Sequence, residues 1–307
     1  MNKKRVIVSI IILCIFAGLL GYLSSSNNAY ANMQTKERWI TLCDTLQNVI
    51  DNPKIKGKKI VHIDKPFELD DKYKSVEMLQ AEAFANLKQV EKLIKKNKAD
   101  YKLCYLTFDD GPYAKTDKFL KRLDKYNIQA TFFTTSVNGK RCYDDKSKKT
   151  APFYKKYLLY GHTIANHTYS HKIFHGIYKN KKNFINSIKK QERHVKKLTG
   201  YTTRIARFPG GSYTAGRLRT PIIKELYKNN YAWVDWSAET GDGGLIKSSK
   251  KQFKRFKKTM GDDIEVVLCH DYTNKTYKLL PKMIKYARKH NYIFAPLFPE
   301  SSAVNHK

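Results

Sequence analysis

From Tyr101 onwards, short apolar runs alternate with segments of helical periodicity, and this alternation constrains the fold more than any other feature. Runs typical of buried strands lie at 103–108, 130–135, 161–166, 204–208, 231–236, 264–269 and 292–296. Segments with apolar residues three and four positions apart separate most of them, at 116–127, 182–200, 220–230 and 275–291. Pro281 is expected to kink or delay the last helix. Strands alternating with helices predict an α/β fold with a parallel sheet, either doubly wound or closed as a barrel.

The first 31 residues have the layout of an export segment. A basic start, MNKKR, precedes a largely apolar stretch at 6–23, and AYA at 29–31 is a small-x-small cleavage site after a Ser/Asn-rich linker. The apolar stretch is also long enough to stay uncleaved as a membrane anchor. Both alternatives place the rest of the chain outside the cytoplasm, either secreted or associated with the cell wall.

Residues 32–100 form a second region, which we expect to be mainly helical. Its clearest element, 75–96, has apolar residues at helical spacing and Ser75 as a plausible N-cap. We find no group of catalytic residue types in it. The region either packs against the main domain, 101–300, or spaces that domain from a membrane.

The charge balance points to a polyanionic partner. The 307 residues carry a net charge of +32, from 59 basic and 27 acidic side chains. Nucleic acid, anionic lipid and an anionic wall polymer would all suit this excess. Export disfavours nucleic acid, which leaves wall polymers or a membrane surface. The alternative is a solvated lysine-rich surface with no special partner, and we expect a monomer.

The four cysteines beyond the export segment show no metal-binding or redox pattern. Cys43, Cys104, Cys142 and Cys269 include no CxxC pair, and their spacing selects no disulfide. Cys104 and Cys269 lie in apolar runs, where we expect small buried hydrophobic side chains.

Polar residues gather just after the strand-like runs. In chain order they are Asp109, Asp110, His167, His171, Arg207, Asp235, Asp242, His270 and Asp271. Because the carboxyl ends of parallel strands meet at one edge, we expect these side chains to converge. His162 lies inside a run, and its expected role is structural.

This group predicts metal-assisted hydrolysis of an acyl bond. His167 and His171, spaced to share one side of a single turn, would bind a metal together with one carboxylate, which is the ligand set of a catalytic zinc site. The second carboxylate would take a proton from a water that the metal activates. His270 would be the general acid, and Arg207 would pair with the free aspartate. Backbone N–H groups near Gly210 and Gly211 would stabilise an oxyanion.

Four stretches carry a family resemblance: TFDDGP at 107–112, HTYSH at 167–171, RFPGGS at 207–212 and VVLCHD at 266–271. Over about 101–296 the chain resembles the polysaccharide deacetylases of carbohydrate esterase family 4. The resemblance implies a distorted (β/α)₇ barrel and a divalent metal, commonly zinc or cobalt. It implies Asp109 as catalytic base, His270 as catalytic acid and Arg207 as the residue that tunes the base. The implied metal ligands are Asp110, His167 and His171.

The chain departs from this family pattern at two places. Gly210 stands where the third motif has an aromatic residue, although its backbone N–H, the implied oxyanion donor, remains. The altered fourth motif aligns Asp242 with the motif's aspartate and Gly243 with its tryptophan. Either Asp235 or Asp242 is expected to partner Arg207. We include Asp242 among the expected catalytic residues.

The resemblance implies removal of N-acetyl groups from an amino-sugar polymer. Peptidoglycan N-acetylglucosamine fits export and positive charge best; chitin oligomers, poly-N-acetylglucosamine and O-acetylated xylan are the alternatives. A wall-binding protein on a decayed scaffold is a further hypothesis. A decayed enzyme should have lost at least one of the metal-ligand, base or acid residues, and all are present.

Overall fold

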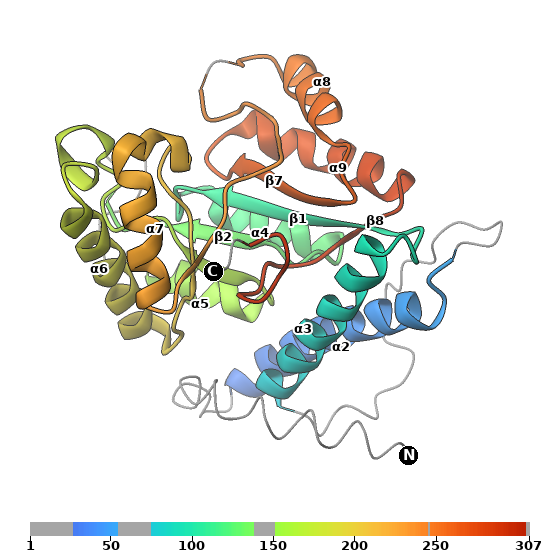
Figure 1. The fold of residues 1–307 in the computed structure, drawn as a ribbon. Helices are drawn as coiled ribbons and strands as arrows, with labels where there is room; N and C mark the ends of the chain where they lie inside the picture. Colours follow the sequence, from blue (N-terminus) through green and yellow to red (C-terminus); the bar gives the residue numbers. More distant parts are fainter. Residues whose placement is uncertain (1–26, 55–74, 138–150, 245, 305–307) are drawn as a thin grey trace.

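The computed structural model describes residues 27–54, 75–137, 151–244 and 246–304 (Figure 1). Within these residues, eight parallel strands form one curled sheet; seven of them follow the order β5-β4-β3-β2-β1-β7-β6, and β8 lies off this path. Strand β8 pairs with the first residues of β1, and β2 with the last ones. The strands are β1 Lys102–Asp109, β2 Thr131–Thr134, β3 Thr163–Asn166, β4 Ile205–Ala206, β5 Ala232–Trp233, β6 Ala238–Glu239, β7 Ile264–His270 and β8 Tyr292–Phe294. The arrangement confirms the α/β prediction and is consistent with a distorted barrel.

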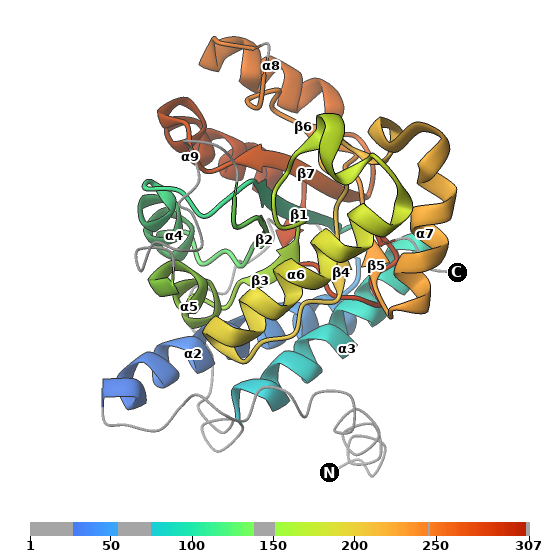
Figure 2. The ribbon, with the colours of Figure 1, turned by 90° about the vertical axis from the view of Figure 1, so that its left-hand side faces the viewer.

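In the described ranges, six helices cover the outer face of the sheet, with α6 and α7 over its β3–β5 side in Figure 2. They are α4 Thr116–Lys125, α5 Ala151–Leu159, α6 Lys181–Thr199, α7 Arg219–Lys228, α8 Ser249–Thr259 and α9 Asn274–Lys289. Two shorter turns, η2 Ile173–Ile177 and η3 Ser212–Leu218, lie near the carboxyl ends of the strands. The delay expected at Pro281 is wrong, because α9 begins at Asn274 and runs through the proline. Its buried face, which includes Leu280 and Ile284, holds the helix across the missing N–H.

Strand β1 lies between two hydrophobic cores, because its successive side chains point to opposite faces of the sheet. Cys104, Leu106 and Phe108 pack with the outer helices α4, α5 and α9. Leu103 and Tyr105 point to the opposite, inner face. The same inner face continues towards the carboxyl end of the strand, where Asp109 lies.

The inner face is covered by a hairpin of two helices, α2 Asn27–Asp51 and α3 Val76–Lys95 (Figure 1). Trp39 and Leu46 of α2 and Leu87 of α3 are fully or almost fully buried in one core with the strands. Ser75 caps α3 as expected, accepting from the N–H of Met78 at 3.2 Å. Residues 27–31, expected to lie in a linker, instead begin α2, because the sequence 27–51 has no Gly or Pro to stop the helix.

Glu91 joins this hairpin to both ends of the catalytic region. Its buried carboxylate accepts hydrogen bonds from Tyr105 Oη at 2.5 Å, Ser301 Oγ at 2.5 Å and the Ser302 N–H at 2.7 Å. A buried carboxylate costs free energy unless it is fully bonded, so these three donors make the contact specific. The hairpin, β1 and the C-terminal segment are therefore one packed unit.

Other expectations fall on residues outside this description. The apolar stretch 6–23 and Cys142 are among them, and so residues 1–26 of the expected export segment are not described. Within the described ranges, no helix has the length and apolar character needed to cross a membrane. Cys43, Cys104 and Cys269 are buried free thiols, as expected for the last two.

Candidate active site

The polar residues singled out in the sequence meet at the carboxyl edge of the sheet. Asp109 ends β1 and lies opposite His270, which ends the neighbouring strand β7. His167 directly follows β3, and Arg207 directly follows β4. The parallel topology thus brings together side chains that are far apart in the sequence, such as Asp109 and His270.

Asp110, His167 and His171 form a compact cluster of donor atoms. Asp110 Oδ1 lies 3.4 Å from His167 Nε2 and 3.1 Å from His171 Nε2. All three atoms lie within 4.8 Å of one another. Asp110 Oδ1 is buried and accepts no hydrogen bond in the described structure. An orphaned buried carboxylate oxygen beside two imidazoles is what a metal site without its ion should show.

The backbone turns these side chains inward by left-handed conformations. Asp110 has φ 73°, which sends its carboxylate in a direction different from that of Asp109. Thr168 and His171, at φ 65° and 51°, fold the HTYSH segment into a bend. The segment is therefore a bend and not a turn of helix, although the two imidazoles lie together as expected. The two imidazoles meet, with ring centroids 5.0 Å apart, because of these two conformations.

The protonation states of the cluster suit metal binding. His167 Nδ1 lies 3.0 Å from the carbonyl oxygen of Arg207, to which it donates, so Nε2 carries the free lone pair. Burial lowers the pKa of His171, which favours the neutral, ligating form. Burial alone would raise the pKa of Asp110, but the three imidazoles around it, led by His167, outweigh that effect and lower the pKa.

The cluster therefore fits a divalent metal. Ligand atoms about 2.0–2.1 Å from a tetrahedral zinc ion are roughly 3.3 Å apart, close to the spacing of the donors here. Two imidazoles and one carboxylate suit zinc and also neighbouring transition metals such as cobalt. These three protein ligands leave the fourth position of a catalytic site open.

Arg207 is completely buried and fixes the position of Asp109. Its Nη1 donates to Asp109 Oδ1 at 2.8 Å and to Thr107 Oγ1 at 2.8 Å. Its guanidinium also lies over the ring of Phe133, 4.0 Å from the centroid. Asp109 Oδ2 remains directed towards the cluster, 3.7 Å from His167 Nε2. The ion pair expected between Arg207 and the free aspartate is present.

Neither of the carboxylates left open as partners of Arg207 contacts it. Asp235 offers only its carbonyl oxygen to Arg207 Nη2, at 3.0 Å. The Asp235 side chain accepts from Ser212 instead, at 3.0 Å from N–H and 2.6 Å from Oγ. Asp242 lies on the other side of the site, beside His270. The buried guanidinium already has Asp109 as its counter-ion, and the neighbouring segment supplies carbonyls.

Asp242 binds His270 at two points. Its Oδ1 accepts from His270 Nδ1 at 2.8 Å, and its Oδ2 accepts from the His270 backbone N–H at 2.9 Å and from Thr276 Oγ1 at 2.6 Å. Burial works against protonation of His270, but the Asp242 hydrogen bond and charge outweigh it and raise the pKa to about 9. His270 Nε2 is left facing the cluster, 3.8 Å from Asp110 Oδ2.

Three glycines define the space around these groups. A side chain at Gly243 would place its Cβ 2.5 Å from His270 Cε1, so this backbone admits only glycine where the family pattern has tryptophan. A Cβ at Gly210 would lie 2.9 Å from Thr214 Oγ1. The Gly211 N–H donates to the Phe208 carbonyl at 2.9 Å and is not an oxyanion donor, contrary to expectation.

Some contributing residues were missed in the sequence. Thr107 supports Arg207, and its position two residues before Asp109 on the same strand face was a usable signal. Thr276 donates a hydrogen bond to Asp242, and no local sequence pattern predicts this contact. His162 has the expected structural role: its buried Nδ1 accepts from the Ala130 N–H at 3.1 Å, and burial lowers its pKa to about 3.

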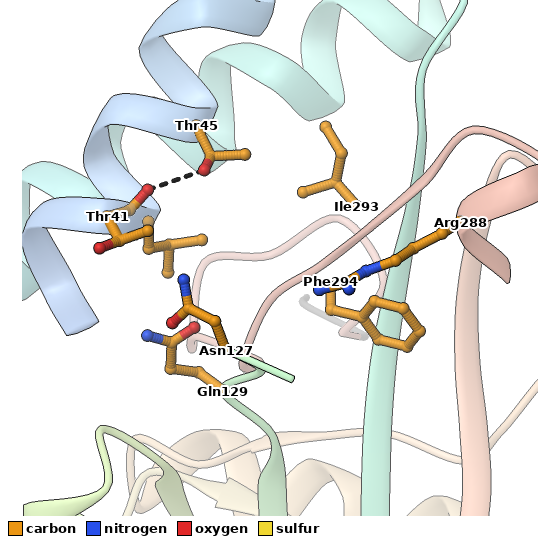
Figure 3. Close-up of a pocket in the computed structure, with 8 residues that line it drawn as sticks. Thr41, Thr45, Asn127, Gln129, Arg288, Ile293 and Phe294 are labelled. Carbon is orange, nitrogen blue, oxygen red and sulfur yellow. Dashed lines mark hydrogen bonds between the residues drawn. The ribbon is translucent and has the colours of Figure 1, made fainter. Parts of the chain in front are cut away.

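Two hollows differ in their relation to the site. A groove of about 440 Å³, lined by Ile173, Phe174, Tyr178, Lys179 and Thr214, lies beside the segment that follows His171. A cavity of about 30 Å³ lies at the opposite end of the strands, between α2 and β8 (Figure 3). The second is the size of one water molecule and is too small for a sugar.

Comparisons with known proteins agree with this geometry. Residues 96–221 match the family model described as polysaccharide deacetylase. A Bacillus cereus peptidoglycan-N-acetylglucosamine deacetylase is 34% identical over 138 residues, which is 45% of this chain and 45% of that relative. A second B. cereus protein of that name is 26% identical over 67% of this chain and 72% of its own. The chain thus spans less than half of the first relative.

A solved structure shares the fold. The catalytic domain of a peptidoglycan N-acetylglucosamine deacetylase from Eubacterium rectale is similar with a TM-score of 0.59 and 28% identity. The match covers 67% of this chain and 93% of that domain.

Proposed function

This chain carries a polysaccharide deacetylase domain of carbohydrate esterase family 4, and from that premise we propose that it removes N-acetyl groups from peptidoglycan N-acetylglucosamine. One observation supports this most strongly. In the donor cluster of Asp110, His167 and His171, the His167 Nε2 lies 3.7 Å from Asp109 Oδ2, and Asp110 Oδ2 lies 3.8 Å from Nε2 of the protonated His270. A metal site with a base and an acid next to it can carry out amide hydrolysis.

The proposed mechanism divides the work among these side chains. A divalent metal, zinc or cobalt, held by the cluster supplies Lewis-acid chemistry. Asp109, through Oδ2, takes a proton from the attacking water. His270 gives the proton on Nε2 to the leaving amine, so acetate and the free amino sugar depart. A pKa of about 9 keeps that proton on His270 at neutral pH.

The remaining residues hold these groups in place. Arg207 fixes one oxygen of Asp109 so that the other faces the cluster. Asp242 keeps Nδ1 of His270 as the donor towards itself, which leaves Nε2–H for the substrate. The Gly210 N–H makes no hydrogen bond with the described residues and is the candidate donor to the developing oxyanion.

We also propose that the protein acts outside the cytoplasm, in contact with the wall. The support is the basic start and the apolar stretch 6–23 of the sequence, which match an export signal or anchor. The names of the relatives agree with a substrate that lies there.

Acetate release from purified peptidoglycan tests the proposal. The full chain should release acetate, a chelator should stop the release, and added zinc should restore it. The matched control is Asp109→Asn, which keeps the shape of the site but removes the base. Release that persists in the chelator would refute the metal mechanism. Release from chitin oligomers but not from peptidoglycan would refute the substrate.

A further inference from the structure

Helix α8 carries a row of lysines on its outer face. They are Lys250, Lys251, Lys254, Lys257 and Lys258, all exposed. Spacings of three and four residues put them on one side of the helix. The opposite side, with Gln252 and Phe256, is buried against the domain.

Helix α9 carries a second row of the same kind. Its exposed lysines are Lys275, Lys278, Lys282, Lys285 and Lys289. The two helices lie against each other (Figure 1), because Tyr286 of α9 contacts the rings of Phe253 and Phe256 of α8, with centroids 6.1 Å and 5.8 Å apart. Helices in contact are about 8–10 Å apart, so the rows are neighbours.

The charge of these rows is not neutralised locally. Neither helix contains an aspartate or glutamate. Arg255 of α8 is paired with Glu239, but in the described part of the chain none of the ten lysines forms an ion pair. Lysines elsewhere do: Lys102, Lys156 and Lys181 each contact a carboxylate. An uncompensated patch raises the local concentration of anions.

We propose that the α8 and α9 lysine rows bind a linear polymer with a phosphodiester charge in each repeating unit, of the polyol-phosphate class. Lysines three and four positions apart rise about 4.5–6 Å along the helix, and the α8 and α9 rows extend about 12 Å and about 21 Å, which suits an extended chain better than a small ion. The inference rests on the proposed function in one respect only, which is the expectation that the protein meets such a polymer in the cell wall.

The composition of the rows distinguishes this partner from others. No large apolar side chain is exposed on α8 or α9, so the surface lacks the groups that insert into a membrane interface. The rows contain lysine without interleaved exposed aromatics, which suits backbone charges and not the stacking of bases.

The surface is placed to act on the reaction. Helix α9 starts just after His270, and α8 follows the loop that carries Asp242. Both rows therefore begin at the catalytic edge and run down the flank of the domain. A polymer bound there would keep the site next to the glycan to which such polymers are attached.

Three variants of equal charge change test the inference. Each replaces three exposed lysines at the spacing i, i+4, i+7 by glutamine: Lys250, Lys254 and Lys257 on α8; Lys278, Lys282 and Lys285 on α9; and, as the matched control, Lys88, Lys92 and Lys95 on α3. The probe is a labelled poly(glycerol phosphate), and the readout is its Kd for the full chain near 0.1 M salt. None of the nine lysines belongs to the catalytic group.

Each row variant should bind about tenfold more weakly and show a shallower dependence of Kd on salt, while the control changes less than about twofold. Equal weakening in all three variants would mean net charge alone and would overturn the inference. So would tighter binding, by the same rows, of phosphatidylglycerol vesicles or of single-stranded DNA. Acetate release from a short soluble oligosaccharide should be unchanged in the row variants; its absence in every variant and in the parent would refute the proposed function while leaving the binding result intact.

Discussion

Replacing Asp242 by asparagine removes the negative charge beside His270 and leaves the size of the side chain almost unchanged. The amide oxygen can still accept from His270 Nδ1, so the imidazole keeps its orientation. The Asp242 hydrogen bond and charge are the main groups that raise the pKa of His270 to about 9 against the effect of burial. Without the charge, that pKa should fall to about 6.5 or lower.

The direction of the effect on activity follows from the role of His270. A general acid must carry its proton, so activity falls as the pH rises through its pKa. For the parent enzyme this limb is expected near pH 9, the pKa of His270. For the variant it should move down by about two units or more, which corresponds to roughly 3 kcal/mol. At pH 8 only about one thirtieth of the variant would be protonated, whereas at pH 6 most of it would be.

The assay is acetate release as a function of pH, with kcat and KM measured separately. The ratio of variant to parent kcat should be roughly 20-fold lower at pH 8 than at pH 6. Thr276→Val serves as the control, because it removes a hydrogen bond to Asp242 without changing any charge, and its limb should stay near that of the parent. A loss that is the same at both pH values would refute the reasoning.

Three further predictions concern the other side chains of the site. Asp110→Asn should lose both bound metal and activity, whereas Asp109→Asn should lose activity and keep the metal, as elemental analysis after dialysis would show. Gly243→Ala should lower kcat by about tenfold or more with metal content unchanged, because its Cβ would meet the His270 ring at 2.5 Å; a fully active variant would contradict this. Arg207→Met should lower the free energy of unfolding in urea by about 3–5 kcal/mol, because it leaves the Asp109 carboxylate buried without its partner; an unchanged midpoint would contradict it.

Local patterns were enough to predict most of the sheet. The runs at 103–108 and 264–269 became β1 and β7, because an apolar run between turn residues has few other ways to be buried. Strand β6 contains only two residues, like β4 and β5, but those two lie within apolar runs of the sequence. Strand β6 was missed because polar residues, Ser237 and Thr240, flank it.

The metal cluster was predictable and the contacts behind it were not. Asp110 and His167 follow buried strands directly, so topology alone places them at one edge. Asp242 lies in a long loop, and its partner, 28 positions away, depends on how that loop folds back on β7. The surface against which α3 packs could not be predicted either. An amphipathic pattern shows which side of a helix is buried, but it does not show which element covers that side.

The Glu91 contacts have a consequence for how the molecule can be divided. By sequence motif the catalytic part begins near residue 101, yet Trp39, Leu46 and Leu87 fill the same core as Leu103 and the C-terminal segment. A fragment cut at that boundary would expose an apolar sheet face to water and leave Tyr105 Oη and Ser301 Oγ without their acceptor. The boundary that homology draws is therefore not a boundary of cooperativity, and the helical hairpin should unfold together with the sheet it covers.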